Sequence, residues 1–561
     1  MKRIATAWMA AALTLTAGQA QTQTLAQVPA RSVDALFSQW TAPGAPGCAV
    51  AVTRAGEVAF TGAYGQAVIE TGRANTPTTA FHIASVSKQF TAFAIQLLAA
   101  EGRLSLDDDV RKYVPELHDF GAPITVSHLL HHTSGLRDQW ELLVMRGRRH
   151  EDTISQKDVL TALFAQRELN FTPGERFAYS NSNYSLLALV VERVSGQAFA
   201  DFMAARVFQP LGMTDTWISA DHHRIRAGQA GPYAPAREGF ERRYLPYSNY
   251  GATGVRTSAA DMARWMIQMD RGTVGGAAVR AAMAEAGALD DGSPTPYAAG
   301  LIPGVYRGMR TLEHAGIDPG YAAHLLTLPD AHLGVAVMCN VETNGLRETA
   351  RRIADLYLGA ASAPGTTRLV GEGLPIAAFA GSYRDPDGLP FAIELRDGKL
   401  FLQGQDEMEP LGGGAFRLKG PGMDGSGLEM SVRATTRAGP PDMVLHEPDF
   451  DRILTRVPTR SAPTLGGEAL AAYRGAYYSP ELGVVLRVEM RGEQLWFVSP
   501  GLEAPLLQPP ELLREADVFF TPSPMGWLRF VRDGAGAITE VSATNGRVVA
   551  LRFLKIEAPG L

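Results

Sequence analysis

The chain has 561 residues, of which 46% are hydrophobic, and a formal net charge of −6 at pH 7. This length exceeds what one hydrophobic core usually serves, so we expect about two to four domains. Because the charges are spread along the chain without basic or acidic blocks, nothing indicates a nucleic acid or an anionic membrane as a partner.

The first twenty residues have the pattern of a signal peptide. Two basic residues precede an apolar run over residues 4–17, and Gly18 and Ala20 then offer small side chains at the positions that a signal peptidase reads. The run is too short to span a bilayer as a helix, and no other stretch reaches the necessary length. We therefore expect a signal peptide over residues 1–20, a periplasmic or secreted product and no membrane span. The alternative is a buried N-terminal helix.

The next elements lead to a serine and a lysine that form the most informative pair in the chain. Residues 48–53 and 57–64 predict a strand hairpin, and a helix is expected from Ser85 to about Ala100. Lys88 follows Ser85 by three residues, so a helix places the amine within hydrogen-bond reach of the hydroxyl. Such a pair is a nucleophile with its base attached.

Two later motifs supply partners for this pair. Tyr179-Ser180-Asn181 precedes a helix that is expected to start near Tyr184, so a loop would present its phenol and amide. A tyrosine beside a lysine ammonium can lose its proton more easily and take one from serine. His314-Ala315-Gly316 follows the strand-like stretch 309–313 and offers an edge of small residues, where backbone N–H groups could meet a substrate carbonyl.

The remaining elements before residue 360 predict a sheet with a helical insertion. From residue 102 to about 270 the pattern is mostly helical, and Ser258 and Asp261 form a capping-box-like start for one of these helices. Strand-like runs then return, and a last helix closes the domain; these elements cover residues 305–313, 322–328, 333–339 and 346–358. The nucleophile is expected at the junction of the sheet and the insertion.

The chain after residue 359 contains an internal repeat. Phe379-Ala380-Gly381-Ser382-Tyr383 recurs as Tyr473-Arg474-Gly475-Ala476-Tyr477, and each copy continues with short alternating runs broken by Gly and Pro. Copies of roughly ninety residues predict two small antiparallel all-β barrels. We expect these barrels to tune specificity and not to complete the catalytic core. The expected division is a signal peptide, a catalytic domain, a linker and two barrels, over residues 1–20, 21–359, 360–376, 377–460 and 461–561.

The motifs resemble those of the penicillin-recognising serine hydrolases, which include class C β-lactamases, DD-peptidases, D-aminopeptidases and certain esterases. Ser-x-x-Lys, Tyr-x-Asn and Lys/His-x-Gly occur in the family's order, and residues 128–136, His-Leu-Leu-His-His-Thr-Ser-Gly-Leu, resemble another family segment. The resemblance covers roughly residues 30 to 360 and implies an α+β catalytic domain, with an antiparallel sheet flanked by helices and a helical subdomain. With two barrels, the layout resembles that of three-domain bacterial D-aminopeptidases.

The resemblance also implies roles for individual residues. Ser85 would attack a carbonyl while Lys88 and Tyr179 remove its proton, and Asn181 would bind the substrate's acyl amide. The N–H groups of Ser85 and Ile317 would hold the oxyanion, and the His314-Ala315-Gly316 edge would contact the substrate. No cofactor is required.

The third motif limits the substrate class. Ala315 follows His314, so the hydroxyl that helps related enzymes to hold a substrate carboxylate is missing. We therefore predict a secreted peptidase or amidase that acts on D-amino-acid-containing substrates, with a small molecule or short peptide as partner. The alternatives are a carboxylesterase or weak β-lactamase, and a penicillin-binding sensor or scaffold without turnover. Nothing in the sequence indicates an oligomeric state.

Other conspicuous residues have ordinary explanations. His128, His131 and His132 lack a carboxylate at metal-ligand spacing, so no metal site is expected. Five aromatic residues could line a cleft or simply pack; they are Trp140, Trp217, Tyr233, Tyr247 and Tyr250.

The chain has two cysteines, Cys48 and Cys339, which is too few for a disulfide framework. In the related fold the first and last strands of the sheet are neighbours, so the two residues could lie opposite each other. Buried free thiols are the favoured expectation and a bridge the alternative, because a bridge directly across paired strands is geometrically demanding.

Overall fold

The computed structural model describes residues 30–359, 374–412, 414–419, 429–432, 442–446, 451–459, 462–521 and 524–557. The expected signal peptide and residues 360–373 of the expected linker lie outside the described residues. The domain boundaries given above therefore stay predictions.

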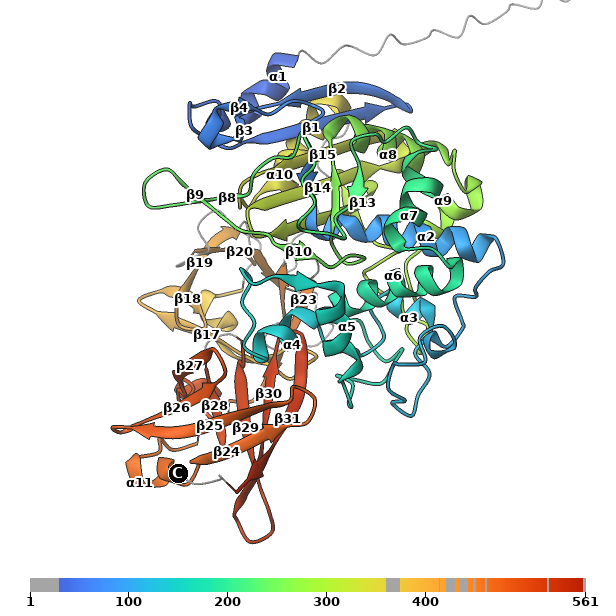
Figure 1. Cartoon of the computed structure of the whole chain (residues 1–561). Helices are drawn as coiled ribbons and strands as arrows, with labels where there is room; N and C mark the ends of the chain where they lie inside the picture. The colour runs from blue at the N-terminus through green and yellow to red at the C-terminus, as the bar shows by residue number, and fades with distance from the viewer. Residues whose placement is uncertain are drawn as a thin grey trace, which may run out of the picture.

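The catalytic part is built on a six-stranded antiparallel sheet formed by the two ends of this region of the chain (Figure 1). The strands are, in spatial order, β12 (Ile302–Tyr306), β13 (Met309–Asp318), β14 (Tyr321–Leu328), β15 (Leu333–Cys339), β1 (Cys48–Arg54) and β2 (Glu57–Ala63). The expected α+β arrangement, with a helical insertion between β2 and β12, is confirmed.

Both faces of this sheet are covered by helices. Along β1 the side chains alternate: Val50 and Val52 share a core with Ile353 of α10 (Leu346–Leu358), whereas Ala49 belongs to the core that contains Trp265 of α8 (Ala259–Arg271). A strand with a hydrophobic residue at every position is what a sheet buried on both sides requires.

The helical insertion surrounds a central helix that starts immediately after the nucleophile turn, which we define as residues 84–87. This turn is 3-10 helical, and α2 (Lys88–Ala100) continues from it and packs on α6 and α9 (Figure 1). In the described part of the chain, no helix is both long and apolar enough to cross a bilayer. The other helices of this part are α1 (Ala30–Asp34), α3 (Val126–Leu130), α4 (Gln139–Met145), α5 (Gln156–Phe164), α6 (Asn181–Ser195), α7 (Phe199–Met203) and α9 (Gly276–Ala284).

The region around the third motif differs from the single strand expected over residues 305–313. The chain instead forms a hairpin of β12 and β13, which turns at Arg307 and Gly308. Both turn residues have positive φ, 51° and 77°, as a two-residue hairpin loop that follows the strand twist requires. An arginine at the first turn position hides this turn from a sequence pattern, because arginine rarely adopts positive φ.

The expectation of free thiols is wrong, because Cys48 and Cys339 form a disulfide. They are directly opposed on β1 and β15, with Cα atoms 4.0 Å apart. The backbone N–H and C=O of Cys48 both bond to Tyr64 on the other side of β1. The cysteines thus form a non-hydrogen-bonded pair, the kind of antiparallel pair in which side chains lie closest.

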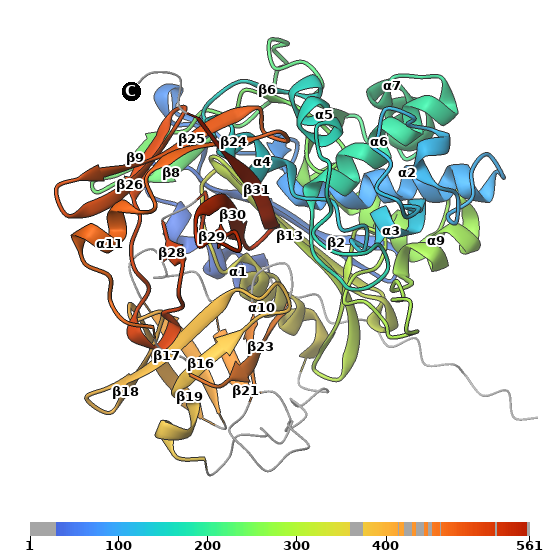
Figure 2. The same ribbon diagram turned by 90° about the horizontal axis from the view of Figure 1, so that it is seen from below.

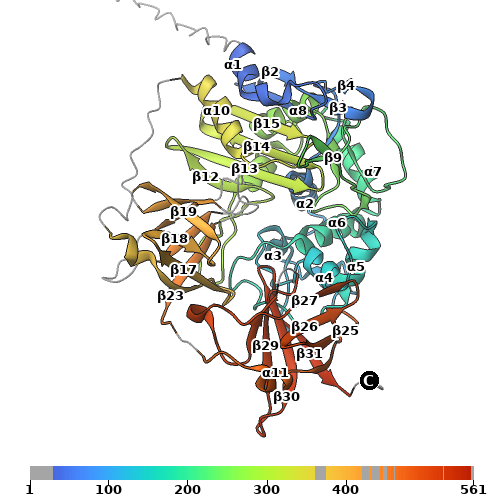
Figure 3. The same ribbon diagram turned by 90° about the vertical axis from the view of Figure 1, so that its left-hand side faces the viewer.

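The two sequence repeats form two antiparallel all-β units, as expected, and each unit has eight strands. The first is a closed barrel and the second an eight-stranded sheet (Figure 3). Each repeat begins alike: the Tyr383 hydroxyl donates to the Phe379 carbonyl at 2.7 Å, and the Tyr477 hydroxyl to the Tyr473 carbonyl at 2.9 Å. The strands of the first unit are β16 (Gly381–Arg384), β17 (Pro390–Arg396), β18 (Lys399–Leu402), β19 (Asp406–Gly412), β20 (Ala415–Lys419), β21 (Glu429–Val432), β22 (Met443–His446) and β23 (Asp451–Val457). Those of the second are β24 (Gly475–Ser479), β25 (Val484–Arg491), β26 (Gln494–Ser499), β27 (Leu502–Pro505), β28 (Val518–Phe520), β29 (Trp527–Arg532), β30 (Ile538–Asn545) and β31 (Val548–Ile556).

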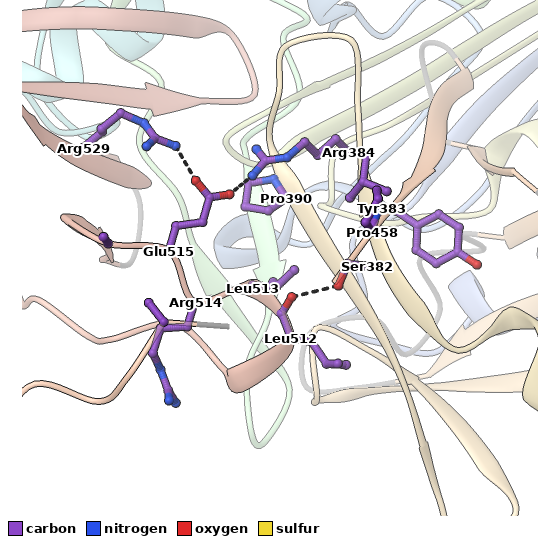
Figure 4. A pocket seen from close by; sticks show the side chains of 13 residues that line it. Ser382, Tyr383, Arg384, Pro390, Pro458, Leu512, Leu513, Arg514, Glu515 and Arg529 are labelled. Carbon is purple, nitrogen blue, oxygen red and sulfur yellow. Dashed lines mark hydrogen bonds and ion pairs between the residues drawn. The ribbon is translucent and has the colours of Figure 1, made fainter. Parts of the chain in front are cut away.

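A cleft of about 640 Å³ separates the barrel from the second sheet. Across it Arg384 of the barrel donates to Glu515 of the second unit, and Glu515 also accepts from Arg529 of its own unit at 2.8 Å (Figure 4). The Ser382 hydroxyl also donates to the Leu512 carbonyl at 2.8 Å. The two units are therefore joined by polar contacts at the rim of the cleft.

Candidate active site

The nucleophile turn presents Ser85 at the end of the central sheet. Ser85 is partly exposed, whereas the residues on either side of it are buried. The preceding Ala84 has a φ of +46°, a conformation that L-residues other than glycine adopt rarely and that recurs at functional sites.

Lys88 lies one helical turn after Ser85, as the spacing predicts. Its fully buried Nζ donates to Ser85 Oγ at 3.0 Å, to Asn181 Oδ1 at 2.8 Å and to the Ala252 carbonyl at 2.9 Å. Three acceptors match the three N–H bonds that an ammonium group can donate. The first two sequence motifs are thus brought together.

Two cationic side chains lie close to the Tyr179 ring. The Lys88 Nζ is 4.9 Å from the centre of its ring, and the Arg547 guanidinium is 5.1 Å from it. The His132 ring packs against the phenol at 4.4 Å, and burial holds the pKa of His132 well below its usual value, so this imidazole is neutral. Positive charge near the phenol therefore comes from Lys88 and Arg547.

Asp138 is a site residue that the motifs do not reveal. Its Oδ2 accepts from the backbone N–H of Asn181 at 2.7 Å and from the Asn181 side-chain amide at 2.8 Å. This fixes the amide so that its oxygen faces Lys88. Asp138 also caps α4 by accepting from the Trp140 N–H at 2.8 Å.

The third motif forms the edge opposite the nucleophile. β12 pairs with β13 only as far as Glu313, so the rest of β13 has a free edge, which lies against the nucleophile turn. A Cβ at Gly316 would lie 2.4 Å from the Ile83 carbonyl oxygen and 3.0 Å from the Ser85 nitrogen, so only glycine allows this approach. Gly316 and Ile317 both line the pocket that holds Ser85.

His314 does not line this pocket. It is fully buried, its Nε2 lies 2.8 Å from the Tyr297 hydroxyl, and its ring centre is 6.2 Å from that of Tyr179. Direct contact between His314 and a substrate therefore stays a prediction.

The pocket around Ser85 has a volume of about 590 Å³ and an acidic, aromatic lining. Its carboxylates are Glu141, Glu151, Asp318 and Glu342, its arginines are Arg243 and Arg547, and its aromatic residues include Trp140, Tyr179, Tyr244 and Tyr247. Of the five aromatic candidates from the sequence, Trp140 and Tyr247 lie here, with ring centres 4.9 Å apart. Trp217, Tyr233 and Tyr250 do not line it.

A hairpin of the second C-terminal sheet completes the pocket wall. The turn between β30 and β31 reaches α4, as Figure 2 shows. Asn545 donates to Glu141 Oε2 at 2.8 Å, and the Arg547 carbonyl accepts from the Asp138 N–H at 3.2 Å. Asn545-Gly546 is a recognisable hairpin signal, but no local pattern shows where the hairpin docks.

The three neighbouring histidines have structural contacts. His128 forms a capping box with Thr125, and His131 Nδ1 lies 3.1 Å from the Tyr297 carbonyl. His132 Nδ1 lies 2.9 Å from the Asn183 amide. The three histidines therefore have structural partners, and His132 also packs against the Tyr179 ring.

The family comparison agrees with this geometry. A family model described as Beta-lactamase matches residues 33–358. A D-aminopeptidase of Brucella canis is 28% identical over 517 residues, which cover 89% of this chain and 93% of that protein. A D-aminopeptidase of Gluconobacter oxydans is 30% identical over 298 residues, which cover 53% of this chain and 56% of that protein.

A solved structure shares the fold. The octameric penicillin-binding protein homologue from Pyrococcus abyssi matches 73% of this chain and 96% of its own, with a TM-score of 0.53 and 23% identity. Because the family model covers more than half of the chain, the protein belongs to the beta-lactamase family and is a serine hydrolase.

Proposed function

We propose that this serine hydrolase cleaves the amide bond that follows a D-amino acid with a free amino group, through an acyl-enzyme on Ser85. The Lys88–Ser85 hydrogen bond of 3.0 Å, in a pocket with four carboxylates, carries the proposal. The pKa of Glu141 is raised to about 7, but the three other carboxylates still outnumber the two arginines, which favours an ammonium-bearing substrate. The two D-aminopeptidases that this chain resembles support the D-amino-acid part.

The proposed reaction is a two-step acyl transfer. Ser85 Oγ attacks the substrate carbonyl carbon, and its proton passes to the Tyr179 oxygen, with Lys88 and Arg547 stabilising negative charge on that oxygen. Tyr179 then gives the proton to the leaving amine as the C–N bond breaks. A water molecule, deprotonated by the same phenol, attacks the ester and releases the acid.

The substrate contacts follow from the pocket lining. The N–H groups of Ser85 and Ile317 would receive the carbonyl oxygen as it becomes an oxyanion. The Asn181 amide, held by Asp138, would meet the substrate's own amide while its oxygen keeps Lys88 in place.

A substrate panel and active-site labelling test this function. We expect the wild-type protein to hydrolyse D-alanine p-nitroanilide at least about tenfold more efficiently than the L-isomer, and to react with a fluorophosphonate at Ser85. Ser85→Ala should lose both properties, and Tyr179→Phe should slow both acylation and deacylation. Ser87→Ala is the matched control, because the Ser87 hydroxyl lies in the same turn but accepts from the Val255 N–H at 3.1 Å.

Two results would contradict the proposal. Label that remains on Ser85→Ala in intact-mass analysis would remove Ser85 as the nucleophile. Turnover of p-nitrophenyl acetate or nitrocefin, without any cleavage of the D-anilide, would leave the nucleophile in place but reject the substrate class.

We also propose that the protein works in the periplasm or outside the cell. The Cys48–Cys339 disulfide supports this location, because disulfides form and persist in oxidising compartments. Alkylation followed by mass analysis of periplasmic and cytoplasmic fractions provides the test. Recovery of the protein only from the cytoplasm, with both thiols alkylated, would argue against export.

A further inference from the structure

Two polar side chains of the pocket wall and one buried histidine form a closed hydrogen-bonded group that the proposed reaction does not use. His82 Nε2 lies 2.7 Å from Asp318 Oδ2, and the Thr253 hydroxyl donates to the same oxygen at 2.7 Å. The Thr253 Oγ1 and His82 Nε2 atoms are 3.0 Å apart. His82 and Thr253 are buried, whereas Asp318 and Thr253 also line the pocket that contains Ser85.

Each member of this group belongs to a segment that carries a different part of the catalytic machinery. His82 ends β5 (Phe81–His82), three residues before Ser85. Thr253 directly follows Ala252, whose carbonyl accepts from Lys88. Asp318 ends β13 and directly follows Ile317, whose N–H would hold the oxyanion. The Asp318 Oδ2 atom therefore joins three segments: the one that carries Ser85, the one whose carbonyl accepts from Lys88, and the β13 edge that would bind the oxyanion.

Backbone pairing of β5 with β11 (Val255–Thr257) already joins the chain around Ser85 to the chain around Thr253, and Asp318 adds a link from both to β13. Gly316 has no side chain that could lock β13 against the nucleophile turn, and the free edge of β13 begins after Glu313. A hydrogen bond from each neighbouring segment to Asp318 supplies the missing restraint. Displacement of an oxyanion donor by a fraction of an ångström is enough to weaken catalysis.

The charge on Asp318 strengthens both contacts. Within the residues that the structure describes, Asp318 pairs with no Arg or Lys side chain. Burial lowers the pKa of His82, although Asp318 opposes this shift, so His82 donates as a neutral imidazole. Hydrogen bonds from neutral donors to an ionised carboxylate are shorter and stronger than those between neutral groups.

We propose that Asp318 is a positioning residue that, through His82 and Thr253, holds the Ile317 N–H at the right distance from Ser85 for oxyanion binding. The inference rests on the acyl-enzyme function proposed above. It concerns the relative position of two backbone segments, and not a direct contact between Asp318 and the substrate.

Variants of Thr253 give the sharpest test, because valine removes the hydroxyl but keeps the shape, and serine keeps the hydroxyl. We expect Thr253→Val and Asp318→Asn to lower kcat for p-nitrophenyl acetate by about ten- to a hundredfold with little change in KM. Thr253→Ser should retain at least about a third of wild-type kcat. Rates are expressed per fluorophosphonate-labelled site, so that misfolded protein does not count.

A boronic acid inhibitor provides a second readout. The Ser85 oxygen would form a bond to boron, and one boron-bound oxygen would enter the oxyanion position. Inhibition by phenylboronic acid should therefore weaken in proportion to kcat/KM across the variants, because both depend on the same N–H groups.

Three outcomes would overturn the positioning role. If the variants label less and melt at a lower temperature than the wild type, but keep the same kcat per labelled site, the role of His82, Thr253 and Asp318 is purely structural. An increase in KM for amine-bearing substrates, with unchanged kcat for the ester, would make Asp318 a substrate-binding residue and not a positioning one. Reduced kcat with unchanged boronic acid inhibition would separate the group from the oxyanion site. Failure of the wild-type protein to label or turn over any ester would instead reject the proposed function.

Discussion

At the scale of single residues, Glu141 is a carboxyl of the pocket wall with a strongly raised pKa. Its pKa is raised from 4.5 to about 7, mainly by burial and then by the nearby charge of Asp138, while Arg547 and Asn545 partly oppose the shift. The folded protein thus prefers the protonated form of this carboxyl, whereas the unfolded chain ionises it at its ordinary pKa.

This difference predicts how stability depends on pH. The contribution of protonated Glu141 is fully present below about pH 4.5 and is lost as pH rises through about 7, at a cost of up to about 3 kcal/mol in the free energy of unfolding. Glu141→Gln cannot ionise and avoids this loss. Urea titrations should therefore show the variant gaining stability relative to the wild type between pH 5 and pH 8. A difference that stays constant over this range would contradict the pKa shift.

The catalytic residues could be predicted from the sequence where their motifs are local. Ser85 and Lys88 are one turn apart, and the Tyr179 to Asn181 motif lies at the start of a helix, so each motif is visible by itself. Asp138 could not be found in this way, because its contact with Asn181 joins residues 43 positions apart. His314 was found from its motif, but the motif does not show whether a side chain faces the pocket or the core. In the structure the His314 side chain is buried and does not line the pocket.

At the scale of elements, the hairpin of β30 and β31 brings to the pocket a positive charge, on Arg547, from outside the catalytic domain. We expect Arg547→Ala to lower kcat by about tenfold for both an ester and an anilide, because it removes positive charge beside Tyr179. Arg547→Lys should keep most of the activity. Steady-state kinetics on both substrates, at one pH, measure the effect.

A nearby arginine provides the control for this prediction. Arg552 lies on β31 but is half exposed and pairs with Glu540, so Arg552→Ala should leave kcat almost unchanged. Equal losses in the two alanine variants would show that the hairpin acts through stability alone. Loss on only one substrate would assign Arg547 to substrate recognition and not to the phenol.

The boundaries of helices and strands could be predicted where a hydrophobic pattern extends over many residues, and less well at turns. The helix over residues 346–358 agrees with α10, and β1 and β15 agree with their apolar runs. The β12–β13 turn was not predicted, because Arg307 adopts a left-handed conformation that its residue type does not suggest. The disulfide was ranked second because the hydrogen-bonding class of a strand pair depends on the register, which a sequence does not give.

At the scale of the whole molecule, the C-terminal sheet is bound to the catalytic domain through a buried ion pair. Arg137 is only 1% exposed and donates through Nη1 to both Glu481 carboxylate oxygens at 2.7 Å. The neighbouring Arg146 donates to the Glu481 carbonyl at 2.7 Å. The linker-like composition after residue 359 suggested that the C-terminal units are separable from the catalytic domain. Composition does not show which contacts form when the chain folds back, so the ion pair could not be predicted.

The pair predicts that the C-terminal sheet stabilises the catalytic domain as well as shaping its pocket. Glu481→Ala would remove the buried carboxylate from the Arg137 guanidinium and leave only the half-exposed Glu168 carboxylate, at 3.7 Å, so it should lower the free energy of unfolding by about 3 to 5 kcal/mol. Glu481→Gln keeps a hydrogen-bond acceptor and should cost less.

Glu116→Ala is the control, since both side chains of the Glu116–Arg193 pair are exposed and solvent screens their interaction. Urea titrations of the full chain, followed by tryptophan fluorescence and by Ser85 labelling, compare the four proteins. If Glu481→Ala and Glu116→Ala shift the midpoint equally, the interface does not stabilise the catalytic domain, and the barrels act on specificity alone.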